Sequence, residues 1–206
     1  MIKNIIFDFG GVIYDIDHKL SRLAFKKLGV KNFDELYGHE KQTQLFEKME
    51  CGAYSKAEFR AKLQQFLPEA VCDKDIDDAW SALLIGFDSR KIDLLEELQK
   101  NYALFLLSNS NIIHYERFMP ELNAYKKFDD LFIESWFSHE KGMRKPEKEF
   151  YLKLLEENNL QAHECLFIDD LDTNIEAAKN LGLQTHYLKS EQSILDLFKN
   201  GKLLCF

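Results

Sequence analysis

The chain has 206 residues, enough for one domain or for a core domain with a modest insertion. Hydrophobic residues make up 46% of it and charged residues 30%, which is the balance of a soluble globular protein with a real core. A net charge of −8, with no long run of lysine or arginine, argues against nucleic acids and anionic membranes as partners.

The apolar start of the chain fails as an export signal, because Asp8 interrupts it and no small-residue cleavage site follows. No stretch approaches the roughly 20 apolar residues that a membrane span needs. The four cysteines are scattered without C-x-x-C spacing, which is typical of reduced thiols. We therefore expect a cytoplasmic protein with no membrane partner.

The first half of the chain starts with one strand and continues with helices. Residues 2–8 are β-branched and apolar and predict a buried strand that ends at Asp8, because Gly10 and Gly11 follow at once. Ser55 and three residues later a glutamate form a predicted capping box. Amphipathic spacing predicts helices over 18–28, 42–49, 55–68, 75–84 and 88–100.

The second half alternates between strands and helices. Apolar runs predict strands over 102–107, 131–134, 165–168 and 184–188. Periodic segments predict helices over 111–118, 146–158, 173–181 and 191–200.

Strands that alternate with helices indicate an α/β fold with a doubly wound parallel sheet. The block over 16–87 shows helices without strands, so we expect an inserted helical cap domain there. Residues 1–15 and 88–206 would then form the α/β core. In residues 46–54 a glycine interrupts the helical pattern, and this segment forms either a loop that faces the site or an ordinary helix connection.

Polar residues follow three of the predicted strands. Asp8 ends the first, Ser108 and Asn109 follow the second, and Asp169 and Asp170 follow the third. In open α/β sheets, ligands bind at the carboxyl ends of the strands. Each residue alone has an ordinary interpretation as a cap or turn former. Two adjacent acids after an apolar run nevertheless need a partner, and Mg²⁺ favours carboxylate oxygens.

Four segments in order resemble the motifs of the haloacid dehalogenase-like hydrolase superfamily, and the resemblance covers nearly the whole chain. The segments are FDFGGVI at 7–13, LLSN at 106–109, GMRKPE at 142–147 and FIDDLDTN at 167–174. The family carries a helical cap after its first motif, where the helical block lies. The first and third motifs look most like those of the alpha-D-glucose-1-phosphatase-like branch.

The resemblance implies a mechanism for this chain. Asp8 would be the nucleophile that forms an aspartyl-phosphate, and Lys145 would neutralise charge beside it. Mg²⁺ would be bound by Asp8, the main-chain carbonyl of Gly10 and Asp170, with Asp169 acting directly or through a water. The physical requirements of phosphoryl transfer agree, because positioning and charge neutralisation dominate that reaction.

The resemblance also implies supporting roles. Asn174 would orient Lys145 or the residues around the metal. Arg144 either binds a substrate hydroxyl or phosphate or forms a structural ion pair. The substrate-binding group would be Ser108, Asn109, Gly10, Gly11 and Arg144. The substrate would be a small phosphate ester, with sugar phosphates first, whereas the sequence does not determine the oligomeric state.

Gly10 departs from the family pattern. Most phosphatases of the family carry a second aspartate there, which protonates the leaving alcohol and later activates water. Losing such acid–base help costs about 10²–10⁴-fold in rate. Candidate replacements are Asp15, Asp17, Glu47, Glu50 or solvent, and the histidines that could reach the site are His18, His39 and His114.

Three functions therefore remain open. The first is a phosphatase with another proton donor. The second is a 2-haloacid dehalogenase, which releases a halide and needs neither proton donor nor metal. The third is a non-catalytic module that binds phosphorylated ligands. The adjacent acids Asp169 and Asp170 favour the phosphatase.

Overall fold

The computed structural model of the chain describes residues 1–30, 37–38, 41–42 and 44–204. A five-stranded sheet lies at its centre, with the strand order β7-β6-β1-β8-β9 and parallel pairing throughout. This confirms the predicted α/β fold. The strands are β1 (Asn4–Phe7), β6 (Ala103–Ser108), β7 (Glu134–Phe137), β8 (Cys165–Asp169) and β9 (Gln184–Tyr187).

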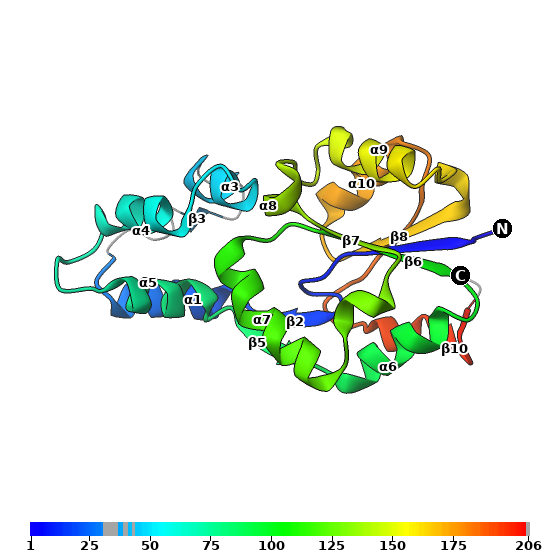
Figure 1. Cartoon of the computed structure of the whole chain (residues 1–206), viewed down its shortest axis with the longest axis horizontal. Helices are drawn as coiled ribbons and strands as arrows, with labels where there is room; N and C mark the ends of the chain where they lie inside the picture. The colour runs from blue at the N-terminus through cyan, green and yellow to red at the C-terminus, as the bar shows by residue number, and fades with distance from the viewer. Residues whose placement is uncertain (31–36, 39–40, 43, 205–206) are drawn as a thin grey trace.

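Helices cover both faces of the sheet because the side chains of each strand alternate between the faces. Ile5 and Phe7 of β1 belong to one buried apolar cluster, whereas Ile6 belongs to the other. Figure 1 shows α9 and α10 on one side of the sheet and α6 and α7 on the other. The helices of this part are α6 (Ser89–Leu98), α7 (Ile112–Tyr125), α8 (Ser138–Lys141), α9 (Lys148–Glu157) and α10 (Asp172–Asn180).

The helices between β2 and β5 pack around an apolar cluster of their own. Phe46, Phe59 and Trp80 lie at its centre, and Ile113 at the start of α7 joins it from the side of the sheet. Figure 1 shows these helices as a separate group beside the sheet. They are α1 (His18–Lys27), α3 (Gln44–Glu50), α4 (Lys56–Gln64) and α5 (Asp73–Ser81).

The helical group is joined to the sheet by two antiparallel strands, β2 (Tyr14–Ile16) and β5 (Leu84–Phe87). The expectation of helices alone in this block is therefore wrong, and two further short strands, β3 (Tyr37–Gly38) and β4 (Lys41–Gln42), also lie in it. The start of β5 was predicted as part of the helix over 75–84, because the apolar residues after α5 continue the helical spacing. The division of the chain into domains at 16–87 stays a prediction.

Two predicted helix starts are confirmed by their caps. Ser55 Oγ accepts from the Glu58 backbone N–H at 3.3 Å, and the Glu58 carboxylate accepts from the Ser55 N–H at 2.8 Å. Asp88 caps α6 by accepting from the Arg90 N–H at 2.9 Å. Such caps satisfy backbone donors that the first turn of a helix leaves unpaired.

The predicted helix over 191–200 is wrong. A 3₁₀ turn over Ile194–Asp196 is followed by a hairpin of β10 (Phe198–Lys199) and β11 (Lys202–Leu203). Asn200 and Gly201 form its two-residue turn with φ of 52° and 66°, the positive values that an Asn-Gly turn accepts easily. The apolar spacing before this turn imitates a helix.

Three other boundaries differ from the prediction. The strand expected over 131–134 is β7 at Glu134–Phe137, after a 3₁₀ turn, and Ile133 is exposed. The helix expected from Pro146 begins at Lys148, and α7 continues past Pro120 to Tyr125. Within the described residues, no helix has both the length and the apolar character needed to cross a bilayer.

Replacing Trp80 by alanine should destabilise the protein by about 3–5 kcal/mol, the usual cost of a large cavity in a core. Trp80 is buried, and its ring lies 4.8 Å from that of Phe46 and 4.8 Å from that of His114. Urea unfolding followed by circular dichroism measures the effect. The control is Phe66→Ala, at a half-exposed side chain, and an equal loss in both variants would contradict this packing.

Candidate active site

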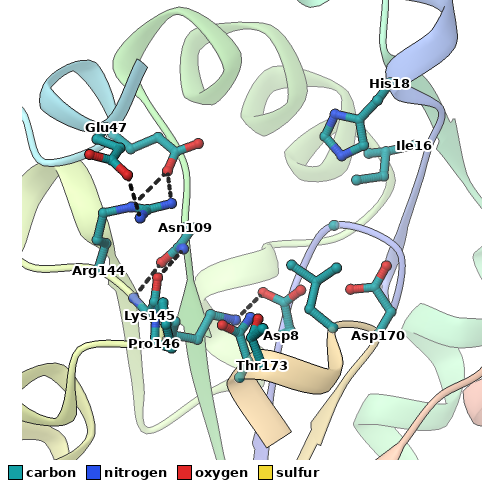
Figure 2. A pocket seen from close by; sticks show the side chains of 14 residues that line it. Asp8, Ile16, His18, Glu47, Asn109, Arg144, Lys145, Pro146, Asp170 and Thr173 are labelled. Carbon is teal, nitrogen blue, oxygen red and sulfur yellow. Dashed lines mark hydrogen bonds and ion pairs between the residues drawn. The ribbon is translucent and has the colours of Figure 1, made fainter. Parts of the chain in front are cut away.

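The carboxyl ends of the central strands bring the predicted site residues together. Asp8 follows β1, Asn109 follows β6, and Asp170 follows β8. A cavity of about 500 Å³ opens above them, and Lys145 also lines it. Figure 2 shows Lys145 extended toward Asp8, with Asp170 on the other side of Asp8.

Lys145 is the central cation of this site. Its side chain is 1% exposed, and its Nζ lies 2.6 Å from Asp8 Oδ1 and 2.6 Å from Asp169 Oδ2. A buried ammonium group is costly unless it is paired and hydrogen-bonded, and two carboxylates meet this need. Lys145 is therefore a buried member of the site, unlike most lysines, which are solvated on the surface.

Asp169 accepts hydrogen bonds from three residues. Besides Lys145, the side-chain amide of Asn174 donates to both of its oxygens, at 3.0 and 3.1 Å. The Leu171 N–H donates to Asp169 Oδ1 at 2.8 Å. Asn174 therefore contacts Asp169, which in turn contacts Lys145, and its orienting role stays a prediction.

The three acids carry more negative charge than one lysine neutralises. Burial raises the pKa of Asp8 to about 8; Lys145 opposes this rise, and Asp169 and Asp170 add to it. Burial and then Asp169 raise the pKa of Asp170 to about 6. Burial lowers the pKa of Lys145, but Asp169 and Asp8 more than offset this and raise it.

The donor set fits a hard divalent cation. One carboxylate oxygen from each of Asp8, Asp169 and Asp170 lies within 4.8 Å of the others. Mg²⁺ prefers such oxygen ligands, and its positive charge would offset burial and the neighbouring acids, which together raise the pKa values of Asp8 and Asp170.

Gly10 and Gly11 differ in how much room an added side chain would have. A Cβ on Gly11 would lie 2.1 Å from Asp170 Oδ2, and its φ of +81° already disfavours other residues. A Cβ on Gly10 would lie 3.1 Å from Ile16 Cδ1. The space that the aspartate of related phosphatases would need at this position is therefore bordered by the Ile16 side chain.

Asn109 and Ser108 make their described hydrogen bonds to the protein itself. Asn109 Nδ2 donates to the Lys145 carbonyl at 2.9 Å, and its Oδ1 accepts from the Lys145 N–H at 2.8 Å. Ser108 is buried and donates to the Asn109 carbonyl at 3.4 Å. Asn109 lines the cavity and Ser108 is not among its lining residues, so the substrate-binding roles of both stay predictions.

Arg144 forms the structural ion pair that was one of its two predicted roles. Its Nε and Nη2 lie 3.0 and 2.9 Å from Glu50 Oε2, and its Nη1 lies 3.6 Å from Glu47 Oε1. Both glutamates belong to α3 and line the cavity together with Arg144. The part of the segment 46–54 that reaches the cavity is therefore helical, at Glu47 and Glu50 of α3.

Most of the candidate proton donors are engaged away from the cavity or paired. Asp15 lies 2.7 Å from the ammonium of Lys91, and Asp17 caps α1 by accepting from the Lys19 N–H. His18 lines the cavity and is exposed.

Of the other two candidate histidines, one does not line the cavity and the other lies outside the described residues. His114 is buried beside Trp80, and burial lowers its pKa to about 4, so its ring is neutral at pH 7. His39 lies outside the described residues.

The cavity also includes residues that sequence reasoning missed, namely Ile16, Pro146, Leu171 and Thr173. Three of them are next to a predicted site residue in the chain: Pro146 follows Lys145, Leu171 follows Asp170, and Thr173 precedes Asn174. Ile16 enters through the β2–β5 pair, which no pattern in the sequence indicated.

Comparison with known proteins agrees with this geometry. The family description that fits the sequence is haloacid dehalogenase-like hydrolase, and it matches residues 2–182. The D-ribitol-5-phosphate phosphatase of Bacteroides thetaiotaomicron is 35% identical over 187 residues, which cover 90% of this chain and 91% of that protein.

Solved structures with similar folds include an enzyme of the same family from Bacteroides thetaiotaomicron, crystallised as the wild-type protein with magnesium and inorganic phosphate. It superposes with a TM-score of 0.87 at 33% identity, over 97% of this chain and 100% of that chain. A predicted haloacid dehalogenase-like hydrolase from Porphyromonas gingivalis superposes with a TM-score of 0.86 at 29% identity, over 95% of both chains.

Replacing Gly11 by alanine should displace Asp170 and weaken Mg²⁺ binding. The matched control is Gly142→Ala, because Gly142 has a similar φ of +67° but no heavy atom within 4 Å of an added Cβ. Both variants should lose about 1–3 kcal/mol of stability through backbone strain. Only Gly11→Ala should show a weaker Mg²⁺-dependent rise in melting temperature, and equal rises in the two variants would contradict the proximity of Gly11 and Asp170.

Proposed function

We propose that this chain, which belongs to the haloacid dehalogenase-like hydrolases, is a magnesium-dependent phosphatase that attacks small phosphorylated sugars or polyols with the carboxylate of Asp8. One observation carries the proposal: Asp8 lies on the cavity surface, 2.6 Å from the buried ammonium of Lys145, with Asp170 beside it. A carboxylate nucleophile, a fixed cation and a site for a metal are the equipment of phosphoryl transfer.

Mg²⁺ is the cofactor that the donor set fits. Asp8, Asp170 and the carbonyl of Gly10 would bind the ion directly. Asp169 would support it indirectly, because its oxygens already accept hydrogen bonds. When bound, Mg²⁺ withdraws negative charge from the phosphoryl oxygens. The solved relative with magnesium and inorganic phosphate supports this assignment.

Asp8 then carries out two steps. One of its oxygens attacks phosphorus, the ester P–O bond breaks, and the leaving alcohol takes a proton. Water next attacks phosphorus in the aspartyl-phosphate, which releases inorganic phosphate and restores the carboxylate. Lys145 stays protonated because Asp169 and Asp8 raise its pKa against the effect of burial, so it orients Asp8 and offsets the charge of the phosphoryl group.

The proton for the leaving alcohol comes from outside position 10. Asp15 and Asp17 are engaged elsewhere, and Glu50 is held by Arg144. Of the remaining predicted donors, Glu47 and His18 both line the cavity, and solvent is the third.

The substrate class rests on the relatives and on the cavity. The ribitol phosphate phosphatase named above supports a small polyol or sugar phosphate. We also propose that the helical group of α1, α3, α4 and α5 works as a cap over the cavity, because Glu47 and Glu50 of α3 line it. Membership of the alpha-D-glucose-1-phosphatase-like branch stays a prediction.

The two other functions left open by the sequence are supported less well. A 2-haloacid dehalogenase has no use for a cation site, yet Asp169 and Asp170 are placed to form one. A module that only binds phosphorylated ligands does not need a buried lysine against a carboxylate nucleophile.

Replacing Asp8 by asparagine should lower the turnover of p-nitrophenyl phosphate by about 10³-fold or more, since the nucleophile is lost. EDTA should suppress the wild-type activity, and added Mg²⁺ should restore it. The control is Asp130→Asn, at an exposed residue remote from the cavity, which should keep full activity. Undiminished turnover in Asp8→Asn would rule out this nucleophile.

Replacing Asn109 by alanine should lower kcat by about 10–100-fold, the usual cost of losing a residue that orients a catalytic group. The physical reason is that Asn109 holds the Lys145 backbone through two hydrogen bonds. If Asn109 acts only as a positioning residue, KM should change little. A rise in KM with kcat unchanged would show instead that Asn109 binds substrate.

A further inference from the structure

We propose that Glu47 makes this site selective for phosphate esters whose carbon skeleton is uncharged, and against esters that carry a second anionic group. The inference rests on the proposed function, because it concerns the part of the cavity that would receive the rest of the substrate. The residues that carry it are Glu47, Glu50 and Arg144.

These three residues form one wall of the cavity. Figure 2 shows Glu47 and Arg144 facing each other at one side of it, apart from Asp8 and Asp170. The phosphoryl end of a substrate belongs near Asp8 and Lys145. The remainder of a small ester then extends toward the wall that Glu47 and Arg144 share.

The two glutamates do not share Arg144 equally. Glu50 receives both close contacts from Arg144, at 3.0 and 2.9 Å, and its side chain is 11% exposed. Glu47 lies 3.6 Å from Arg144 Nη1, beyond a strong hydrogen bond, and its side chain is 43% exposed. Of these two glutamates, Glu50 is therefore paired more closely with Arg144 than Glu47 is.

The more exposed member of this wall is therefore a carboxylate, that of Glu47. Of the two glutamates, Glu47 is the one that Arg144 contacts less closely, so its negative charge is the one that a substrate would meet. A carboxylate accepts hydrogen bonds from hydroxyl groups, which suits a polyol chain. A carboxylate or a second phosphate on the substrate would instead meet the like charge of Glu47.

A matched pair of substrates tests the proposal. Glycerol 3-phosphate and 3-phosphoglycerate have the same length, but the first ends in a hydroxymethyl group and the second in a carboxylate. In the wild-type protein with Mg²⁺, kcat/KM should favour glycerol 3-phosphate by about tenfold or more, the effect of one close like charge near a protein surface.

Glu47→Gln removes the charge and keeps the size and the polar end of the side chain. It should shrink this ratio by about tenfold, mainly by lowering KM for 3-phosphoglycerate. The control is Glu69→Gln, at an exposed glutamate of the same helical group that does not line the cavity, and it should leave the ratio unchanged. An unchanged ratio in Glu47→Gln, or a wild-type protein that hydrolyses both esters equally, would overturn the proposal.

Binding separates this inference from the proposed function. The dissociation constants of both esters are measured with Mg²⁺ in Asp8→Asn and in Asp8→Asn with Glu47→Gln. If Asp8→Asn binds glycerol 3-phosphate more tightly than 3-phosphoglycerate, and Glu47→Gln removes this difference, charge selection is supported. That support holds even if the wild-type protein hydrolyses neither ester, a result that would overturn only the proposed reaction. Equal binding of the two esters in both variants would overturn charge selection, whatever the turnover of p-nitrophenyl phosphate.

Discussion

The buried ammonium of Lys145 is the interaction on which the rest of the site depends. A charge in this position is stable only if its partners stay in place, and removing one partner leaves the others uncompensated. Asp8 and Asp169 supply the negative charge, Asn174 fixes Asp169, and Asn109 fixes the Lys145 backbone. Residues from three other chain segments, at the ends of β1, β6 and β8, thus converge on Lys145.

The adjacent residue Arg144 connects this arrangement to the helical group. Its guanidinium contacts Glu50 on α3, whereas the side chain of Lys145 points into the sheet ends. One dipeptide therefore links the cluster of Asp8, Asp169 and Asp170 with the wall formed by Glu47 and Glu50. In the function proposed above, the phosphoryl group binds beside Lys145 and the acids that would hold Mg²⁺, and the rest of the ester extends toward Glu47.

The sequence predicted which residues converge better than it predicted what each one contacts. The ends of the apolar strands placed Asp8, Asp169 and Asp170 together, because parallel strands end at one edge of a sheet, and the resemblance added Lys145 to them; the structure brings these four residues together. The pairing of Arg144 with α3 depends on how the helical group packs, which local patterns do not encode. The C-terminal hairpin was missed although Asn200 and Gly201 signalled it, since apolar spacing was given more weight than turn chemistry.

The contact between Gly10 and Ile16 has a consequence for how this site can change over evolutionary time. A Cβ at position 10 would lie 3.1 Å from Ile16 Cδ1 in β2, at the base of the helical group, so the end of the Ile16 side chain would have to move by a few tenths of an ångström. The ease with which position 10 accepts an aspartate therefore depends on the residue at position 16. We expect the two positions to vary together among relatives, with a smaller residue at position 16 where position 10 carries the acid.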